Sequence, residues 1–191
     1  MAVTPSSQLE LGTLAPDFSL PDTDGRKVSL ADFRSVGALL VMFLCNHCPF
    51  VKHVQQQLAK LCQQYQQRGV AVVAISSNDA ESYPADSPQK MKEEQQRAGY
   101  SFPYLYDQSQ AVAKAYRAAC TPEFYLFDSQ RRLVYHGQLD SSRPTNTVPV
   151  TGADLSAAID AALAGRPVPV DQRPSVGCSI KWKPSNEPEY S

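Results

Sequence analysis

The sequence lacks an excess of charge of either sign. Its 191 residues contain 18 lysines and arginines against 19 aspartates and glutamates, and neither sign is gathered into blocks. Proteins that bind nucleic acid or an anionic membrane usually carry a basic patch or stripe. The charge balance therefore argues against both kinds of partner and favours neutral small molecules or other proteins, and we expect a monomer or a homodimer.

The sequence also lacks a long hydrophobic run. The longest apolar stretch, Val36 to Cys45, has ten residues, whereas a helix that crosses a bilayer needs about 20. The first residues, MAVTPSSQLELGTL, contain neither a cationic segment nor an apolar core, so no secretory signal is predicted. Internal repeats are lacking too. We expect a cytoplasmic protein.

The cysteines do not form an even-numbered disulfide framework. There are five, and in a reducing compartment an odd number favours catalytic or metal-binding thiols. The chain is long enough to bury a core without disulfides. We expect a single domain over residues 1–165 and a proline-rich C-terminal tail, 166–191, that packs on it.

The apolar pattern predicts an α/β fold with a central mixed sheet. Two unbroken apolar runs, VGALLVMFL and VAVVAIS, are typical of parallel strands that are covered on both faces. Between them, apolar residues recur at helical spacing until Gly69. Residues 15–33 predict an N-terminal β-hairpin, and residues 123–139 predict an antiparallel hairpin that closes the sheet.

Three further helices are predicted to flank this sheet. Ser87 and the proline after it mark the start of a helix that ends at Gly99. Another helix is expected over residues 109–118. Thr151 and Asp154 resemble a capping box that starts the last helix.

The motif FLCNHCPFVKH contains the strongest chemical signal. Cys45 follows a buried strand and is expected beside a helix N-terminus, where N–H groups and the helix dipole favour a thiolate, so it is the predicted nucleophile. Cys48 lies one turn later and is the predicted resolving thiol. His47, between them, is predicted to tune the thiol pKa.

Two other interpretations of this pair remain open. Cys-x-x-Cys can be two packed small hydrophobic residues. It can also belong to a zinc site that uses Cys45, His47, Cys48 and His53, which would need Cys120 or Cys178 as an outside ligand. The redox interpretation requires neither a metal nor an organic cofactor.

Several other residues are predicted to be structural. Cys62 shares the apolar face of the first helix and is expected in the core. His53 and His136 have no acidic partner visible in the sequence. Lys52 and Glu123 could tune a thiol pKa, but single charged residues of this kind usually lie on the surface.

Taken together, the motifs resemble the thioredoxin-like superfamily, and within it the redoxin branch of peroxiredoxins (the AhpC/TSA family) and TlpA-like thiol-disulfide oxidoreductases. The resemblance covers about Leu11 to Leu163 and rests on the Cys-x-x-Cys motif together with APDFSLPDTDGRKVSLADF, FPYLYDQSQAVAKAY, CTPEFYLFD and VYHGQLD. It implies a thioredoxin-like fold with a cis-proline opposite the active cysteine, at Thr121-Pro122. CNHCPFVKH and GCSIKWK also resemble an uncharacterised bacterial subgroup of about this length.

The resemblance suggests roles for two more cysteines. Cys120 would lie near Cys45 in the family's geometry, either as a third redox thiol or as a packing residue at a strand edge. Cys178 would be a second resolving thiol if the tail folds back to the site. Alternatively, the tail is a docking segment whose Ile180 and Trp182 cover apolar surface.

The function expected from these observations is thiol-disulfide exchange at a redox-active centre. Cys45 would attack a disulfide and form a mixed disulfide that Cys48 resolves, leaving a disulfide bond between the two cysteines. The expected substrate is a disulfide-containing protein or a small thiol, with a thioredoxin- or glutathione-type electron donor.

Two alternatives remain, one of them another enzyme and the other from a different functional class. The first is a peroxiredoxin-like thiol peroxidase with antioxidant activity, in which Cys45 becomes a sulfenic acid. Peroxiredoxins carry Pro and Thr seven and three residues before that cysteine, where this chain has Ala38 and Met42. The second is a redox-sensing or zinc-binding interaction module.

Overall fold

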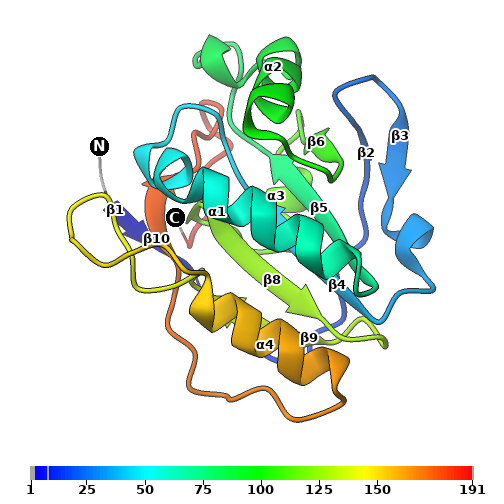
Figure 1. The fold of residues 1–191 in the computed structure, drawn as a ribbon. Helices are drawn as coiled ribbons and strands as arrows, with labels where there is room; N and C mark the ends of the chain where they lie inside the picture. Colours follow the sequence, from blue (N-terminus) through cyan, green and yellow to red (C-terminus); the bar gives the residue numbers. More distant parts are fainter. Residues whose placement is uncertain (1–2, 8, 191) are drawn as a thin grey trace.

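A five-stranded mixed sheet forms the centre of the molecule (Figure 1). The structure, a computed structural model, describes residues 3–7 and 9–190; the outermost residues of the predicted domain and tail therefore lie outside the described part. Three neighbouring strands run parallel and two antiparallel strands complete the sheet. In spatial order they are β6 (Tyr104–Tyr106), β5 (Val70–Ser76), β4 (Ala38–Phe43), β8 (Glu123–Phe127) and β9 (Leu133–Gly137).

Strand β4 lies in the middle of the sheet, and every one of its residues is buried. Alternate side chains face the two sides of a strand. Leu40 and Met42 pack with helices α1 and α4, whereas Leu39 and Val41 pack with α3 and the N-terminal hairpin. This covering on both faces explains the unbroken apolar run, and the predicted parallel pairing with β5 is confirmed.

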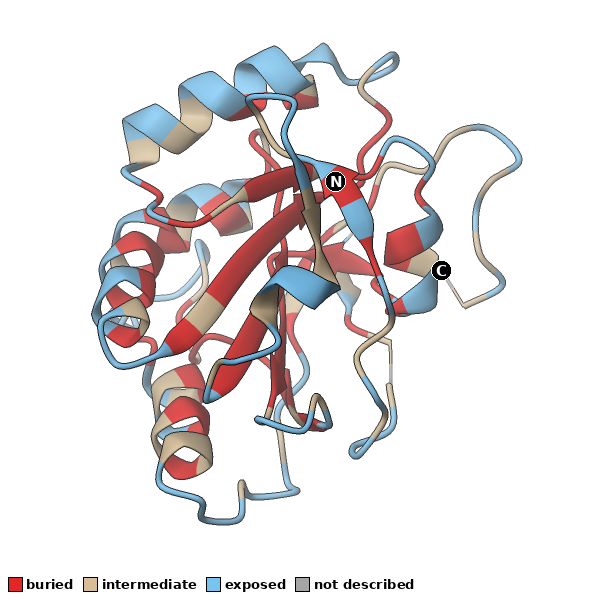
Figure 2. Cartoon of the chain, turned by 90° about the vertical axis from the view of Figure 1, so that its right-hand side faces the viewer, coloured by how far each residue is buried: buried red, intermediate tan, exposed pale blue. Residues whose placement is uncertain are grey.

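Among the described residues, four α-helices flank the sheet. Figure 2 shows the contrast between the buried central strands and the exposed outer faces of helices. The helix after β4 is the longest, and it carries the predicted apolar face. The helices are α1 (Pro49–Gln66), α2 (Pro88–Ala98), α3 (Ala111–Ala115) and α4 (Ala153–Leu163). Within the described part of the chain, no helix combines the length and the apolar character that a bilayer crossing requires.

Two smaller sheets accompany the central one. The predicted hairpin is confirmed as β2 (Ser19–Pro21) paired with β3 (Lys27–Ser29). The other sheet joins both ends of the chain to its middle: β10 (Val176–Ser179) lies between β1 (Val3–Pro5) and β7 (Cys120–Thr121). The sequence pattern did not predict β10, because a strand this short shows no clear alternation.

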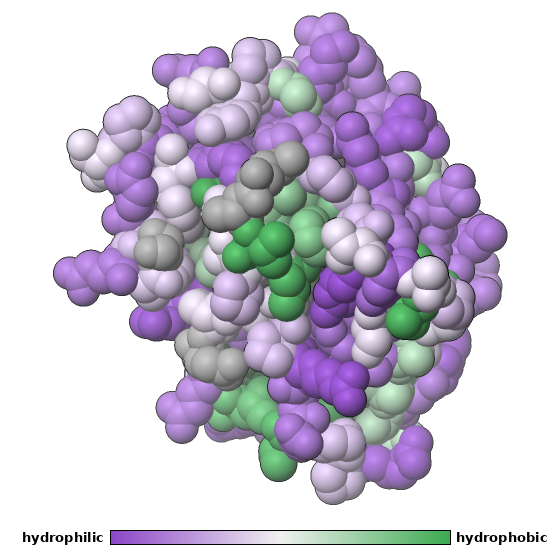
Figure 3. Space-filling view, turned by 90° about the vertical axis from the view of Figure 1, so that its left-hand side faces the viewer, coloured by the Kyte–Doolittle hydropathy of each residue, from purple (hydrophilic) through white to green (hydrophobic). Residues whose placement is uncertain are grey.

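The face beside β1 and β10 carries an apolar patch within a largely hydrophilic surface (Figure 3). Val3, in β1, is 62% exposed.

Two helix predictions are corrected. The helix expected over residues 109–118 is only one turn long, because Gln110 and Arg117 on either side adopt positive φ angles. The prediction of a capping box at the start of α4 is also wrong. Gly152 is the N-cap, the Asp154 carboxylate accepts from the Gln138 side chain, and Asp140 accepts from the N–H groups of residues 151 and 152.

The central strand sets the first prediction. Leu40 is fully buried, so Leu40→Ala should lower the free energy of unfolding by about 3 kcal/mol through lost burial and a residual cavity. Urea denaturation measures the change. Leu14→Ala is the matched control, because Leu14 is 58% exposed and its loss should cost less than about 0.5 kcal/mol. Equal effects of the two substitutions would contradict the central position of β4.

Candidate functional site

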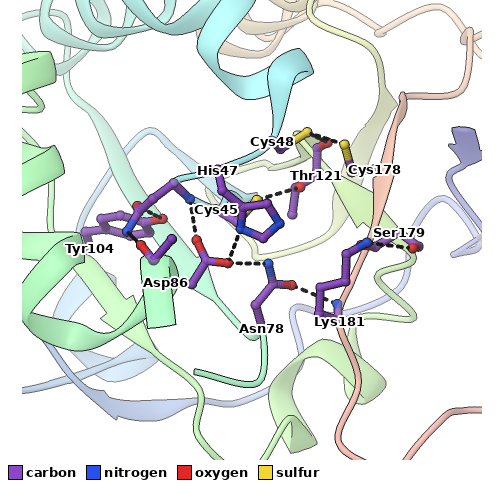
Figure 4. A network of polar contacts seen from close by, with 12 residues as sticks. Cys45, His47, Cys48, Asn78, Asp86, Tyr104, Thr121, Cys178, Ser179 and Lys181 are labelled. Carbon is purple, nitrogen blue, oxygen red and sulfur yellow. Dashed lines mark hydrogen bonds and ion pairs between the residues drawn. The ribbon is translucent and has the colours of Figure 1, made fainter. Parts of the chain in front are cut away.

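The candidate site forms where β4 ends, α1 begins and β7 passes beside them (Figure 4). Cys45 follows β4, and Cys48 is the N-cap residue of α1, with Pro49 as its first helical residue. Cys48, whose backbone is extended, therefore lies at the helix N-terminus itself, and Cys45 lies beside it, three residues earlier.

Thr121 contacts both cysteines of the motif. Its hydroxyl oxygen lies 3.2 Å from the Cys45 Sγ atom. Its carbonyl oxygen lies 3.2 Å from the Cys48 Sγ atom and accepts from Cys48 when that residue is a protonated thiol. The peptide bond between Thr121 and Pro122 is cis, as predicted. One residue of β7 thus brings the two thiols of the Cys-x-x-Cys motif together.

A third thiol reaches the same place from the tail. In the β10–β7 pairing, Cys178 lies opposite Thr121, and the Sγ atoms of Cys178 and Cys48 are 2.8 Å apart. All five cysteines of the chain are thiols and all are buried. Cys45, Cys48 and Cys178 are exposed by only 2%, 0% and 2%, respectively. The tail therefore reaches the site, and it shields the sulfurs from solvent.

The predicted tuning residue His47 points towards a buried acid. Its Nδ1 atom lies 2.6 Å from a carboxylate oxygen of Asp86, which is fully buried. The same carboxylate accepts 2.7 Å hydrogen bonds from the Asn46 backbone N–H and the Asn78 side chain. The imidazole also stacks on Tyr83. Asp86 was missed in the sequence because it lies among turn residues that are usually exposed.

The thiols near Thr121 have divergent pKa values. The hydrogen bond with the Cys45 thiol lowers the pKa of Cys48 to about 5, and hydrogen bonds with the Cys178 thiol and the Val51 N–H act in the same direction. The hydrogen bond with Cys48, burial and the charge of Asp86 raise the pKa of Cys45 well above its usual value. Burial raises the pKa of Cys178 to about 12. The site therefore favours one thiolate, on Cys48.

A second buried acid supports the loop before the cis-proline. Glu123 is fully buried, which corrects the expectation of a surface charge. One carboxylate oxygen accepts from the backbone N–H groups of Ala119 and Cys120, and the other lies 2.7 Å from His136 Nε2. His136 thus has an acidic partner, which the sequence could not show because the contact depends on the pairing of β8 with β9. The sequence signal that could have indicated the burial of Glu123 is its position as the first residue of the otherwise apolar strand EFYLF.

The remaining candidate residues lie at the edges of the site or outside it. The Cys120 sulfur is buried and lies 4.0 Å from the Pro122 carbonyl, and burial raises its pKa well above the usual value. Cys62 lies in the core, as predicted. His53 Nε2 lies 2.7 Å from the Ser142 hydroxyl, and Lys52 is exposed.

The zinc ligand set considered from the sequence is not assembled in this form. His53 is engaged elsewhere, and a different group, Cys45, His47 and Asp86, brings its donor atoms within 4.8 Å of one another. These three residues could hold a metal ion. The Asp86 carboxylate already accepts two hydrogen bonds from nitrogen donors, and a metal would compete with them.

Comparison with known proteins relates this geometry to a family. Residues 11–136 match the model of the AhpC/TSA family. A crystal structure of an uncharacterized conserved protein from Geobacillus kaustophilus is 57% identical, covers 97% of this chain and 98% of that chain, and superposes with a TM-score of 0.95.

Two further relatives are thiol-disulfide oxidoreductases or domains of them. Thiol-disulfide oxidoreductase ResA from Geobacillus thermodenitrificans (strain NG80-2) is 28% identical over 130 residues, which are 68% of this chain and 70% of that protein. The thioredoxin domain of a thiol-disulfide oxidoreductase from Bacteroides vulgatus is 18% identical, covers 78% of this chain and 97% of that chain, and has a TM-score of 0.59. This last likeness shows the thioredoxin-like fold alone.

The divergent pKa values predict a thiolate that titrates at low pH. In the reduced protein, ultraviolet thiolate absorbance should appear above a midpoint of about pH 5 and disappear as the pH falls through it. Cys48→Ser should abolish this titration, whereas Cys62→Ser should leave it unchanged because burial raises the pKa of Cys62. A midpoint near the ordinary cysteine value of about 8.5 would contradict the assignment.

The Glu123 carboxylate should matter for stability. Glu123→Gln replaces an acceptor of two backbone N–H bonds and removes the charge that faces His136. We expect a loss of about 2 kcal/mol in the free energy of unfolding, measured in urea. The exposed Glu187 provides the control, since Glu187→Gln should change stability by less than about 0.5 kcal/mol. A neutral Glu123→Gln would refute a supporting role for the carboxylate.

Proposed function

The chain belongs to the AhpC/TSA family, and from that premise we propose that it is a thiol-disulfide oxidoreductase whose reacting centre is the Cys45–Cys48 pair. The observation that carries this proposal is the contact of both thiols with Thr121, next to the cis-proline. A pair placed only for core packing would not need thiols whose pKa values are driven apart. The similarity to ResA supports the same class of reaction.

The difference between the two thiol pKa values suggests how the first step of the exchange reaction occurs. A Cys48 thiolate that accepts a hydrogen bond from the Cys45 thiol can take the proton from it, which leaves Cys45 as the attacking thiolate. Cys45 then bonds to one sulfur of the substrate disulfide, and the other sulfur leaves as a thiolate. Because Cys48 now carries the proton, it is not yet a competing nucleophile.

The second step resolves the mixed disulfide. Cys48 loses its proton and attacks the Cys45 sulfur, so that a Cys45–Cys48 bond forms and the second substrate thiol is released. The substrate disulfide gains two electrons and the protein pair loses two. A thioredoxin- or glutathione-type donor would return these electrons, and the reverse sequence would oxidise a dithiol.

The burial of the sulfurs supports a restricted choice of substrate. His47, with 24% of its side chain exposed, lies at an open groove that is also lined by Asn46, Lys52 and Glu93. We propose that a small disulfide, or an extended segment of a disulfide-containing protein, reaches Cys45 from this side. All five cysteines are thiols, which supports the proposal of a reducing compartment such as the cytoplasm.

The position of the Thr121 hydroxyl favours a thiol peroxidase as the second candidate function. Peroxiredoxins carry a threonine three residues before the reactive cysteine, and this chain has the buried Met42 there. The Thr121 hydroxyl, 3.2 Å from the Cys45 Sγ atom, offers a hydroxyl from another strand. In that reaction Cys45 attacks a peroxide oxygen and becomes a sulfenic acid, an alcohol or water leaves, and condensation with Cys48 releases water.

A trapping experiment tests the exchange mechanism and separates the two candidates. Reduced Cys48→Ser protein should react with glutathione disulfide more slowly than the wild type, because it lacks the Cys48 base. It should then retain glutathione as a stable mixed disulfide on Cys45, because the resolving thiol is missing as well. Peptide mapping locates the adduct. Cys62→Ser should instead release the glutathione and lose two thiols, as the wild type does. Cys45→Ser should carry no adduct at position 45.

The same variants are then treated with one equivalent of hydrogen peroxide. Faster modification of Cys45 by peroxide than by glutathione disulfide, with a sulfenic acid trapped in Cys48→Ser, would favour the peroxidase. If neither reagent modifies Cys45 while the protein remains folded, the redox proposal fails.

A further inference from the structure

We propose that Cys178 is a third redox thiol of this site, which displaces Cys45 from an oxidised Cys45–Cys48 pair and holds the disulfide with Cys48. This inference rests on the proposed function, because it requires the Cys45–Cys48 disulfide as its starting point. It adds a participating residue from the tail and a second disulfide state.

The position of the Cys178 sulfur supports this role. Its Sγ atom lies 2.8 Å from Cys48 Sγ, compared with about 2.05 Å in a disulfide bond. Cys45 and Cys48 both contact Thr121, so the thiols of the motif and the Cys178 thiol gather at one residue. Figure 4 shows the Cys178 sulfur and Thr121 next to each other beside the Cys48 sulfur. Bonding to Cys178 would require a movement of less than 1 Å along the line that joins the sulfurs.

The backbone of β10 fixes this sulfur in place. Cys178 lies opposite Thr121 in the β10–β7 pairing, and the Ile180 N–H donates to the Ala119 carbonyl. Gly177 lies so close to the cis-proline loop that an added Cβ atom would be 2.0 Å from the Thr121 carbonyl oxygen. The strand therefore approaches only because residue 177 has no side chain.

The segment after the strand anchors it further. Ile180 is buried with the side chains on the α3 face of the sheet, and Trp182 packs at the edge of the same cluster. The Lys181 carbonyl accepts from the Asp79 N–H and the Gln110 side chain. The tail therefore does two things at once: it covers apolar surface with Ile180 and Trp182, and it places the Cys178 thiol beside Cys48.

Core packing alone accounts less well for Cys178 than for Cys62. Both are buried, and Cys62 lies among apolar side chains of α1, where burial is the single cause that raises its pKa. Cys178 instead contacts another sulfur through a strand that requires a glycine beside it. A residue that only filled space in the core would not require the β10–β7 register that places Cys178 beside Cys48.

The proposed step is balanced and needs no added oxidant. The Cys178 thiol gives up its proton and its sulfur attacks Cys48, so that a Cys178–Cys48 bond forms and the Cys48–Cys45 bond breaks. Cys45 leaves as a thiolate and takes up a proton. One disulfide and one thiol are present before and after the step. Cys45 is thereby available for another substrate while the tail is tied covalently to the start of α1.

The Cys45→Ser variant gives the direct test. In a glutathione buffer that oxidises the wild type, we expect this variant to form a Cys48–Cys178 disulfide and to lose two of its four remaining thiols. Thiol counting and peptide mapping measure both. Adding Cys178→Ser should leave Cys48 with bound glutathione instead. Adding Cys62→Ser, the matched buried cysteine, should preserve the Cys48–Cys178 bond.

A backbone substitution tests the docking requirement with all cysteines present. Gly177→Ala should displace β10 and reduce the fraction of Cys48–Cys178 disulfide about tenfold or more, because the thiol is no longer held beside its target. The Cys45–Cys48 disulfide should still form. Gly37→Ala is the control, since an added Cβ atom there meets only Leu163 at 3.4 Å and a backbone oxygen at 3.8 Å.

The outcomes separate the two proposals. If the wild type forms Cys45–Cys48 but folded Cys45→Ser carries only glutathione on Cys48, the role of Cys178 is refuted and the proposed function stands. If Cys48–Cys178 forms in the wild type without any Cys45–Cys48 intermediate at early times, both the exchange pair and the displacement step are overturned.

Discussion

The site depends on one short strand that three cysteines meet, two through their thiols and one through its backbone. Thr121 contacts Cys45 through its hydroxyl and Cys48 through its carbonyl, and its backbone pairs with Cys178. These contacts join segments that are 76, 73 and 57 positions apart in the chain. Any displacement of β7 would therefore separate all three sulfurs together. The arrangement of the sheet, which fixes β7 beside the end of β4, is what gives the thiols their chemistry.

Two buried carboxylates hold the loops on either side of these thiols. Asp86 accepts from the Asn46 backbone in the Cys-x-x-Cys turn, and Glu123 accepts from the backbone at Cys120, next to Thr121. A buried charge is tolerated only when hydrogen bonds replace its lost hydration, and each of these carboxylates has at least two nitrogen donors. Asp86 also acts electrostatically, because its charge disfavours a thiolate on Cys45. Structural support and thiol tuning therefore come from the same group.

The tail changes the character of the site. Because β10 covers the cis-proline loop, the sulfurs are removed from solvent. Burial raises the pKa of Cys178. The hydrogen bonds that Cys48 receives lower the pKa of Cys48. An exposed dithiol can meet a folded protein directly, whereas these sulfurs are approached beside His47. The shielding that limits access also brings a further thiol within reach. Both effects follow from the close approach that Gly177 allows.

The sequence by itself determined the central strands, the N-terminal hairpin and the helix after Cys48, because each depends on local periodicity or on a motif only a few residues long. The position of the cis-proline came from the resemblance to the family and not from a local pattern. The tertiary structure alone decided that Cys48 caps the helix, that Glu123 is buried against His136, that Asp86 meets His47 and that Cys178 reaches Cys48. These contacts join residues that are distant in the chain or depend on strand register. Backbone pairing and burial bring them together, and neither leaves a periodic signal in the sequence.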